Sequence, residues 1–291
     1  MKISCVILNY NDETTTTCLI KEIEHFSALT SIVVVDNLST DNSFEILKKH
    51  ATEKIHVIQT DKNGGYGYGN NFGIRYAVRH SSADYILIAN PDVHFSNDII
   101  IAMAEFLDNN IDYAVVAPRA LKPSGEDQKL LAWKLQSKWD YLLSGSMIYL
   151  KYFSDKFYPK SYYDGKGQAD VAVVPGSLLM VTAKYMMKYG MYDEKNFLYS
   201  EEEIIAIKFK NAGLKTRLLL NDTYIHEHSV SISKSFPSEL KKKRMNLDSR
   251  IFVLNHYYEA TKLEKKIVKI ISKVAFMENT LLFKIKKLIN R

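Results

Sequence analysis

The segment Tyr85-Ile86-Leu87-Ile88-Ala89-Asn90-Pro91-Asp92-Val93 decides how the rest of this 291-residue chain is interpreted. Its first five residues form an uninterrupted apolar run, which is typical of a strand buried on both faces of a sheet. The strand is expected to end at Asn90-Pro91, because proline has no amide hydrogen to donate to a neighbouring strand. Asp92 would then lie beyond the carboxyl end of a central strand, where open α/β sheets bind ligands. It is either a turn residue or a ligand for a divalent cation that holds a phosphate group.

Apolar runs alternate with helical patterns through the first 120 residues. Strands are expected at 3–8, 31–35, 55–58, 85–89 and 113–117, with helices at 14–26, 43–50, 70–79 and 97–107. Continuous apolar strands in such an alternation predict an α/β fold with a mostly parallel sheet covered by helices on both faces. Further strands are expected at 171–174, 177–181, 215–220 and 223–229, and helices at 183–189 and from about 201 to 213.

Polar side chains follow three of the expected strands. Asn9 and Asn11 follow the first, Asp36 follows the second and Asp92 follows the fourth. Adjacent parallel strands end at one edge of a sheet, so these groups should share a crevice. One carboxylate could bind a base or ribose, and a second could bind a metal ion. Together they would suit a nucleotide diphosphate.

Five of the chain's twelve glycines lie between Asn63 and Gly73. This density indicates a backbone with positive φ or a close approach to a ligand, and the alternative is a flexible surface loop. A helix is expected from about Asn70, so the loop would lead to a helix N-terminus that attracts anions. The segment is not a P-loop, because no Gly-Lys-Ser/Thr follows it. It is not a dinucleotide fingerprint, because that motif stands after the first strand with the spacing G-x-G-x-x-G.

Two further groups of residues can carry chemistry. Glu201, Glu202 and Glu203 open an expected helix, where they either complement the helix dipole or supply a general base. His226 and His228 alternate along a short strand and would lie on one side of it, which by itself is a weak metal signal.

Charge is concentrated at the C-terminal end of the chain. Residues 262–291 hold nine basic and two acidic residues, a net charge of +7, whereas the whole chain is +6. The basic balance therefore does not indicate nucleic-acid binding by the main domain. Apolar residues recur at helical spacing from Ile267 to Ile289, with lysines between them. This basic amphipathic pattern predicts docking to an anionic membrane surface, or packing on the domain or on a partner chain.

The remaining composition is that of a soluble globular protein, 46% hydrophobic and 25% charged. Cys5 and Cys18 form no disulfide or metal pattern, which favours a reducing compartment. The apolar run after Lys2 is too short for a signal peptide, and no run approaches the length of a membrane span. We therefore expect a cytoplasmic protein.

The order of these segments resembles the inverting family 2 glycosyltransferases of the GT-A fold, particularly the rhamnosyltransferase-like branch of bacterial polysaccharide synthesis. The matching segments are 4–11, 34–41, 63–65, 70–73, 90–93, 176–177, 197–202 and His226. The resemblance covers about residues 2–232. It implies a GT-A domain at 1–232, with a nucleotide-sugar half at 1–117 and an acceptor and catalytic half at 118–232. Residues 233–291 would form a basic amphipathic helical extension.

The resemblance also implies roles for single residues. Asp36 would bind the donor's base or ribose, and Asp92 with His226 would hold Mn²⁺ or Mg²⁺ on the diphosphate. Glu202 stands where the family has its catalytic aspartate, although Glu201 or Glu203 could substitute. Donor-binding residues would be Asn9, Asn11, Asp36, Asn63, Gly64, Gly65, Asn70 and Asn90. The chain departs from the family pattern at Asn90, which replaces the first metal-binding acid, and at Ile204 and Lys208.

The function implied is transfer of a sugar from a dTDP-rhamnose or UDP-hexose type donor to a saccharide acceptor, lipid-linked and at the inner face of the plasma membrane. An oligomer is compatible with this interpretation. The alternatives are a catalytically degenerate scaffold of the same pathway, an NAD-dependent oxidoreductase and a sugar-1-phosphate nucleotidyltransferase. The last two should carry a glycine-rich loop early in the chain, where this sequence has Asn9-Tyr10-Asn11.

Overall fold

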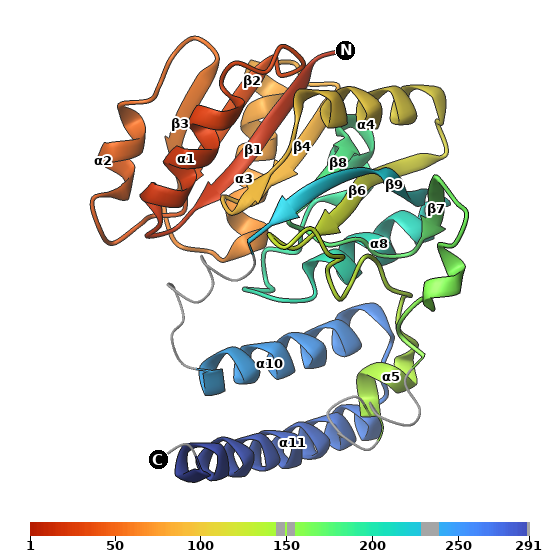
Figure 1. Ribbon diagram of the computed structural model, residues 1–291. Helices are drawn as coiled ribbons and strands as arrows, with labels where there is room; N and C mark the ends of the chain where they lie inside the picture. Colours follow the sequence, from red (N-terminus) through yellow and green to blue (C-terminus); the bar gives the residue numbers. More distant parts are fainter. Residues whose placement is uncertain (144–148, 150–154, 228–238, 290–291) are drawn as a thin grey trace.

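The computed structural model describes residues 1–143, 149, 155–227 and 239–289. One mixed sheet forms the body of the molecule (Figure 1). Across the sheet the strands are β3 (Ile55–Gln59), β2 (Ser31–Asp36), β1 (Ile3–Asn9), β4 (Tyr85–Ala89), β8 (Leu178–Thr182), β6 (Tyr113–Leu121), β9 (Lys215–His226) and β5 (Val93–His94), and β7 (Gln168–Val171) pairs with β9. The α/β architecture predicted from the sequence is confirmed.

The first half of the sheet is parallel, as expected. β1 pairs with β2 on one side and with β4 on the other, and Asn9 is level with Asp36, which is level with Gln59. Ile7 is level with Ala89, so β4 ends beside the end of β1. The polar residues that follow β1, β2 and β4 therefore lie at one edge of the sheet. The second half adds antiparallel pairings, and the sheet as a whole is mixed.

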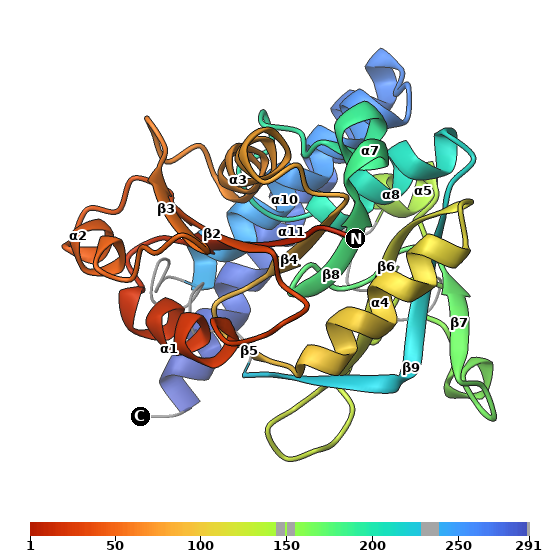
Figure 2. The same ribbon diagram turned by 90° about the horizontal axis from the view of Figure 1, so that it is seen from above.

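Helices cover both faces of the sheet (Figure 2). α1 (Glu13–Ile23), α2 (Ser43–Lys48) and α4 (Asn97–Asn109) bury their apolar side chains on one face. α3 (Tyr66–His80), α7 (Ala183–Tyr185), the following π-helical turn (Met186–Gly190) and α8 (Glu201–Asn211) cover the other. Both faces of the central strands are thereby removed from water, which explains why β4 is apolar throughout and why β1 and β2 are mostly apolar between their ends.

The glycine-rich segment differs from the prediction, because it is largely helical. α3 begins at Tyr66 instead of Asn70, and only Gly65 among the five glycines has a positive φ. The others permit close packing: a Cβ on Gly73 would lie 2.6 Å from Val6 and 2.7 Å from Val35. The glycines therefore bring α3 against β1 and β2, and a flexible surface loop is excluded.

The later strands also differ in their limits. β7 spans Gln168–Val171, and Val173 makes only an isolated bridge to Trp133, so the strand expected at 171–174 was wrongly placed. The two strands expected at 215–220 and 223–229 are one strand, β9, with a register shift against β6 between Pro118 and Arg119. His228 lies outside the described residues.

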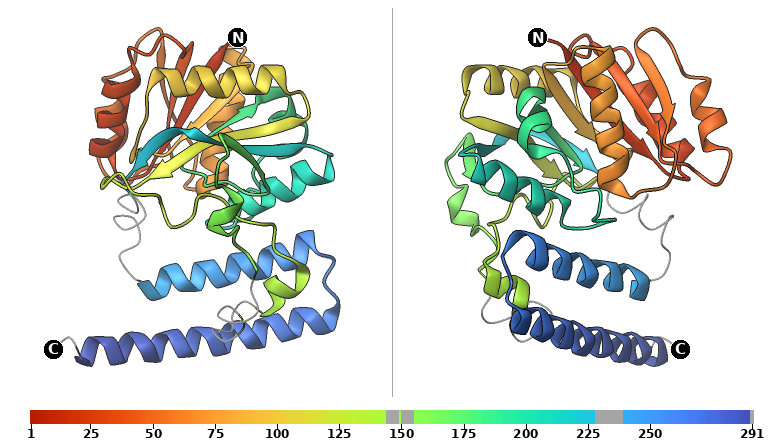
Figure 3. Two further views of the ribbon diagram at one scale, coloured as in Figure 1. Left: turned by 45° about the vertical axis from the view of Figure 1, so that its right-hand side comes forward. Right: turned by 180° about the vertical axis from the view of Figure 1, so that it is seen from behind.

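Two long helices complete the described chain. α10 (Glu239–Tyr257) and α11 (Lys262–Ile289) lie side by side beyond the edge at which β1, β2 and β4 end (Figures 1 and 3). With α5 (Lys138–Leu143) and α8 they share a separate apolar cluster that includes Tyr141, Ile204, Val253 and Val268. The C-terminal helices are thus packed onto α5 and α8 through a core of their own. Within the described residues, no helix has an apolar stretch long enough to cross a bilayer.

Candidate functional site

Asp36 is the centre of a buried hydrogen-bond network at the ends of β1 and β2. Its Oδ1 accepts hydrogen bonds from Asn9 Nδ2 at 2.9 Å and Ser39 Oγ at 2.5 Å. Its Oδ2 accepts from the Ser39 amide at 3.0 Å and Gln59 Nε2 at 2.9 Å. Asn9 and Asp36 are fully buried. The carboxylate therefore fixes the loop after β2, and any ligand that bonded to it would take the place of Ser39 or Gln59.

The rim of this network is formed by two loops. Asn11 has a left-handed backbone, with φ of 53°, and its Oδ1 accepts from the Thr40 amide at 2.8 Å. Asn37 donates to Asn63 Oδ1 at 3.0 Å, and the same oxygen accepts from the Gly65 amide at 3.2 Å. Asn11 and Asn63 thus hold the loops after β1, β2 and β3 together.

The start of α3 packs against the loop that precedes α8. Gly65 has φ of 88°, and a Cβ there would lie 2.0 Å from the carbonyl oxygen of Phe197. The Tyr66 amide donates to that same oxygen at 3.0 Å. Gly64 lies against the ring of Tyr68. Asn70 is buried in the helix, with Nδ2 donating to the Tyr66 carbonyl at 3.0 Å, so it stabilises the first turn.

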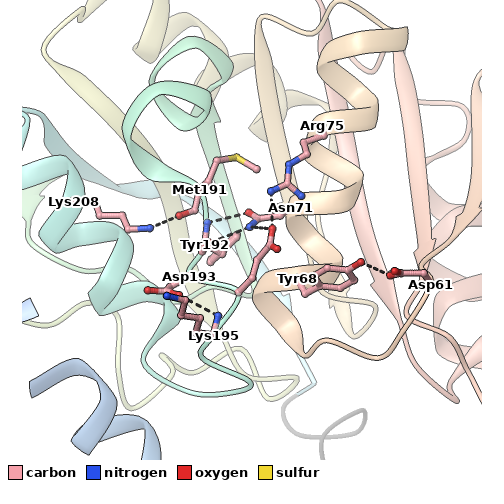
Figure 4. Close-up of polar contacts among 10 residues, drawn as sticks. Asp61, Tyr68, Asn71, Arg75, Met191, Tyr192, Asp193, Lys195 and Lys208 are labelled. Atoms are coloured by element: carbon pink, nitrogen blue, oxygen red, sulfur yellow. Dashed lines mark hydrogen bonds and ion pairs between the residues drawn. The ribbon is translucent and has the colours of Figure 1, made fainter. Parts of the chain in front are cut away.

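Asn71, which the sequence analysis did not single out, holds the loop before α8 (Figure 4). Its Oδ1 accepts from the Tyr192 amide at 2.9 Å, and its Nδ2 donates to the Tyr192 carbonyl at 3.0 Å. One turn later Arg75 pairs with Glu194 at 2.6 Å. On the other side Lys208 of α8 donates to the Met191 carbonyl, and burial lowers the pKa of this lysine. The loop from 191 to 196 is therefore fixed between α3 and α8.

The residues just before α8 have unusual backbone angles. Tyr199 and Ser200 have φ of 74° and 62°, the left-handed region that costs a non-glycine residue free energy. The Tyr199 carbonyl accepts from Asn196 Nδ2 at 2.5 Å and from Ser249 Oγ of α10 at 2.7 Å. The strained backbone of Tyr199 and Ser200 therefore fixes the position of the first turn of α8.

The three glutamates that open α8 occupy different surroundings. Glu203 accepts from Trp133 Nε1 at 3.1 Å and pairs with Lys156 at 3.2 Å, so it is engaged within the protein. Glu202 is half-buried, and its Oε1 accepts from the Gly176 amide at 3.2 Å. Burial, followed by the charge of Glu203, raises the pKa of Glu202 to about 7.

Glu201 is buried, and its Oε1 has no hydrogen-bond partner among the residues that the structure describes. Burial, followed by the charge of Glu202, raises the pKa of Glu201 well above its ordinary value. Two adjacent carboxyl groups thus resist ionisation, and Glu202 is the one that titrates near neutrality.

Tyr66, a second residue that the sequence analysis missed, connects α8 to the end of β4. The single hydrogen of its hydroxyl lies within reach of two acceptors, the Gly176 carbonyl at 3.0 Å and Asn90 Oδ1 at 3.3 Å. The Gly176 amide in turn contacts Glu202, and the Asn90 amide donates to the Ser177 carbonyl at 2.8 Å. Asn90 is therefore a neighbour of the turn that touches Glu202.

Asp92 and His226 face one another at the same edge. His226 is level with Val93, because β5 and β9 are antiparallel, and its Nε2 lies 3.4 Å from Asp92 Oδ1. Their side chains are 12% and 4% exposed. Among the described residues no third histidine, cysteine or acidic residue joins them as a possible metal ligand. Asp92 and His226 thus offer one oxygen and one nitrogen to a divalent ion. They would fit such an ion only if a bound molecule, such as a diphosphate, filled the remaining coordination positions.

Several known proteins are similar in sequence to parts of this chain. The low-salt glycan biosynthesis hexosyltransferase Agl10 of Haloferax volcanii is 32% identical over 123 residues, which cover 42% of this chain and 38% of Agl10. The dTDP-rhamnosyl transferase RfbF of Shigella flexneri is 32% identical over 109 residues, which cover 37% and 35%. The poly(ribitol-phosphate) β-N-acetylglucosaminyltransferase TarS of Staphylococcus aureus is 25% identical over 291 residues, which cover 89% and 50%. The chain spans half or less of the length of these relatives.

Solved structures share the fold. The S. aureus TarS 1–349 structure aligns with a TM-score of 0.54 and 17% identity, over 96% of this chain and 80% of that one. The mannosyltransferase PcManGT from Pyrobaculum calidifontis, in complex with GDP-Man and Mn²⁺, aligns with a TM-score of 0.57 and 13% identity, over 93% and 69%. The family model of glycosyl transferase family 2 matches residues 4–165, which is more than half of the chain. The chain therefore belongs to glycosyl transferase family 2.

Proposed function

We propose that the protein transfers a sugar from a nucleotide-diphosphate donor to a saccharide acceptor with inversion at the anomeric carbon. The observation that carries this proposal is the position of Glu202. Its pKa is raised to about 7, and the Gly176–Tyr66–Asn90 contacts connect it to the strand end that bears Asp92. Dinucleotide binding has no comparable support, because Asn9-Tyr10-Asn11 follows the first strand.

Glu202 is the general base in this mechanism. A base is most effective when its pKa lies near the working pH, because it is then both deprotonated and able to hold a proton. The acceptor hydroxyl loses its proton to Glu202 as its oxygen attacks the anomeric carbon, and the nucleotide diphosphate leaves from the opposite face. Glu201, which is more deeply buried, is the alternative base. Glu203 is engaged by Trp133 and Lys156 and positions the helix.

The donor would lie along the edge formed by the ends of β1, β2 and β4. Asn9 and Asp36 hold the loop that receives the nucleoside, and Asn11 and Asn63 form its rim. Asn90 orients Tyr66. Asp92 and His226 would hold Mn²⁺ or Mg²⁺, which when bound offsets the charge of the leaving diphosphate. PcManGT in complex with GDP-Man and Mn²⁺ supports a divalent ion of this kind.

A donor screen tests the proposal directly. The melting temperature is measured with dTDP-rhamnose, UDP-glucose, UDP-N-acetylglucosamine and GDP-mannose, with and without Mn²⁺. A donor at about 100 times its Kd stabilises the folded protein by about 2.7 kcal/mol. We expect one nucleotide class to raise the melting temperature, more strongly with Mn²⁺. No shift with any nucleotide sugar, together with a shift from NAD, would refute the proposal.

A degenerate scaffold of the same pathway is the second candidate, favoured by the departures at Asn90 and Glu202. Such a protein would bind the donor without cleaving it. Slow hydrolysis of the bound donor by the wild-type protein, absent in Glu202→Gln, excludes this candidate.

We also propose that α11 docks on an anionic membrane surface, at the inner face of the plasma membrane, near a lipid-linked acceptor. Its exposed apolar residues Leu263, Ile270, Val274 and Met277 are 67%, 62%, 50% and 70% accessible and share one helical face. The exposed lysines Lys262, Lys266, Lys269 and Lys273 lie beside that face. Val268 and Ala275, on another face, are buried. An apolar stripe flanked by lysines suits the boundary between acyl chains and anionic headgroups.

Vesicle binding tests this docking. The triple variant Lys266→Glu, Lys269→Glu and Lys273→Glu should bind phosphatidylglycerol vesicles about 100-fold more weakly in sedimentation, because each lysine near the surface contributes about 1 kcal/mol. The matched control reverses three exposed lysines elsewhere, Lys129, Lys160 and Lys184, and should bind as the wild type does. Equal binding by the two triple variants would reject α11 as the docking face.

A further inference from the structure

A cavity of about 520 Å³ lies between the loop that leads to α8 and the helix α10. Phe197 and Leu198 form its wall on the loop side, and Met245, Asp248 and Phe252 form its wall on α10. This volume is within the range of small-molecule sites, about 300–1,000 Å³. The sequence analysis assigned acceptor binding to residues 118–232, and the α10 wall of this cavity lies outside that range.

The cavity is built on the loop that carries the proposed base. Ser200, three residues after Phe197, directly precedes Glu201 and Glu202. The Phe197 carbonyl accepts from the Tyr66 amide at the start of α3. One wall of the cavity is therefore continuous with the donor side of the site and with α8.

The two walls are held in fixed positions. Ser249 of α10 donates to the Tyr199 carbonyl at 2.7 Å, and Tyr257 of α10 donates to Asp193 Oδ2 at 2.7 Å. Phe252 is stacked on His256 with ring centroids 4.2 Å apart, which fixes its orientation. A cavity with such walls is formed before a ligand arrives, so ordering it costs little free energy on binding.

The lining suits sugar rings. Phe197 is 41% exposed, and its ring and that of Phe252 offer apolar surface to the C–H faces of a pyranose. The side chain of Asp248 is 58% exposed, and its Oδ2 accepts a hydrogen bond from Arg244 Nε at 3.2 Å. The remaining acceptor positions of the carboxylate suit charge-assisted hydrogen bonds from vicinal hydroxyl groups. Apolar rings with a few polar groups around them are the usual composition of a small-ligand site.

We infer that this cavity binds the sugar rings of the acceptor next to the hydroxyl that Glu202 deprotonates. The inference rests on the proposed transferase function and adds to it the acceptor subsite. It assigns α10 a part in substrate binding as well as in packing.

The test measures binding of three probes in the absence of donor: p-nitrophenyl glycosides of glucose, rhamnose and N-acetylglucosamine, each at about 10 mM. Saturation-transfer NMR reports their contact with the protein. Phe252→Ala removes one ring, and Met245→Trp fills the cavity without removing packing. Phe157→Ala is the matched control, because Phe157 is 50% exposed and distant in sequence from both walls. Donor binding is followed in all variants by the thermal shift described above.

We expect at least one probe to bind the wild type and Phe157→Ala equally, and about tenfold more weakly to Phe252→Ala and Met245→Trp. Donor stabilisation should be unchanged in all of them. Binding to Met245→Trp as strong as to the wild type, or no probe binding to the wild type, would overturn the acceptor subsite. If no nucleotide sugar raised the melting temperature of the wild type, the transferase function would be refuted instead. The two failures are therefore distinguishable.

Discussion

The substitution Glu202→Gln should increase stability while it removes activity. Burial raises the pKa of Glu202 from its ordinary 4.5 to about 7. The folded state therefore binds more protons than the unfolded state between these values, and the free energy of unfolding falls as pH rises through this window. Since a pKa change of one is worth about 1.4 kcal/mol, the ionised carboxylate costs up to about 3 kcal/mol at pH 8.

Glutamine removes this cost and keeps the oxygen that accepts from the Gly176 amide. We expect Glu202→Gln to raise the melting temperature by about 5 °C at pH 8, with little change at pH 4.5. Transfer, and hydrolysis of the donor by water, should fall by a factor of about 10²–10⁴, the usual contribution of a general base. The measurements are thermal denaturation at the two pH values and donor turnover.

The neighbouring residue provides the control. Glu203→Gln weakens the pair with Lys156 and should lower the melting temperature at pH 8. If Glu202→Gln were also destabilising at pH 8, the raised pKa would be refuted. If the variant kept full activity, the role of Glu202 as the base would be refuted.

Three further predictions follow from the contacts described. Asp92→Ala should abolish the part of the donor's thermal stabilisation that depends on Mn²⁺, whereas Asp98→Ala, an exposed aspartate on α4, should leave it unchanged; equal losses would argue against Asp92 as a ligand. Gly65→Ala should lower the urea midpoint far more than Gly125→Ala. Both glycines have positive φ (88° and 80°), but only Gly65 faces the Phe197 carbonyl. The Gly125 change should cost about 1 kcal/mol of stability, and an equal cost at Gly65 would contradict the packing of this loop. Asn71→Ala should destabilise by about 2 kcal/mol, because the buried Tyr192 amide and carbonyl lose their partners, and should reduce turnover more than donor binding; unchanged turnover would separate this loop from catalysis.

The parts of the fold that depend on local pattern could be predicted. β4 ended where Pro91 removes the amide, and the registers of β1, β2 and β4 placed Asp36 and Asp92 at one edge. The start of α3 could not be predicted, because Gly67 and Gly69 disfavour a helix locally. A Cβ at these positions would lie 2.9 Å from Tyr192 and 2.3 Å from Leu8, and the sequence carries no sign of this close packing. Asn221-Asp222 is typical of a turn, yet β9 continues through it beside β6.

Candidate site residues could be named from the sequence only where a motif marked them. Asp92, His226 and Glu202 belong to recognisable segments, and the structure brings Asp92 and His226 to 3.4 Å. Tyr66 lies between two matching segments and Asn71 lies within one, but their roles arise from contacts with residues more than 100 positions later. A single tyrosine or asparagine carries no signal of such long-range contacts.

The arrangement of the two C-terminal helices would set the distance between the loop before α8 and a membrane bound to α11. α10 touches the loop before the proposed base, and α11 lies on the far side of α10 (Figure 3). Each helix with its side chains is about 10 Å across, so a bilayer beneath α11 would lie about 20 Å below that loop. An acceptor that is anchored in lipid would then have to project several sugar units before its terminal hydroxyl could react. The helix pair would act as a ruler that favours chains already begun by other enzymes over a single sugar on its carrier.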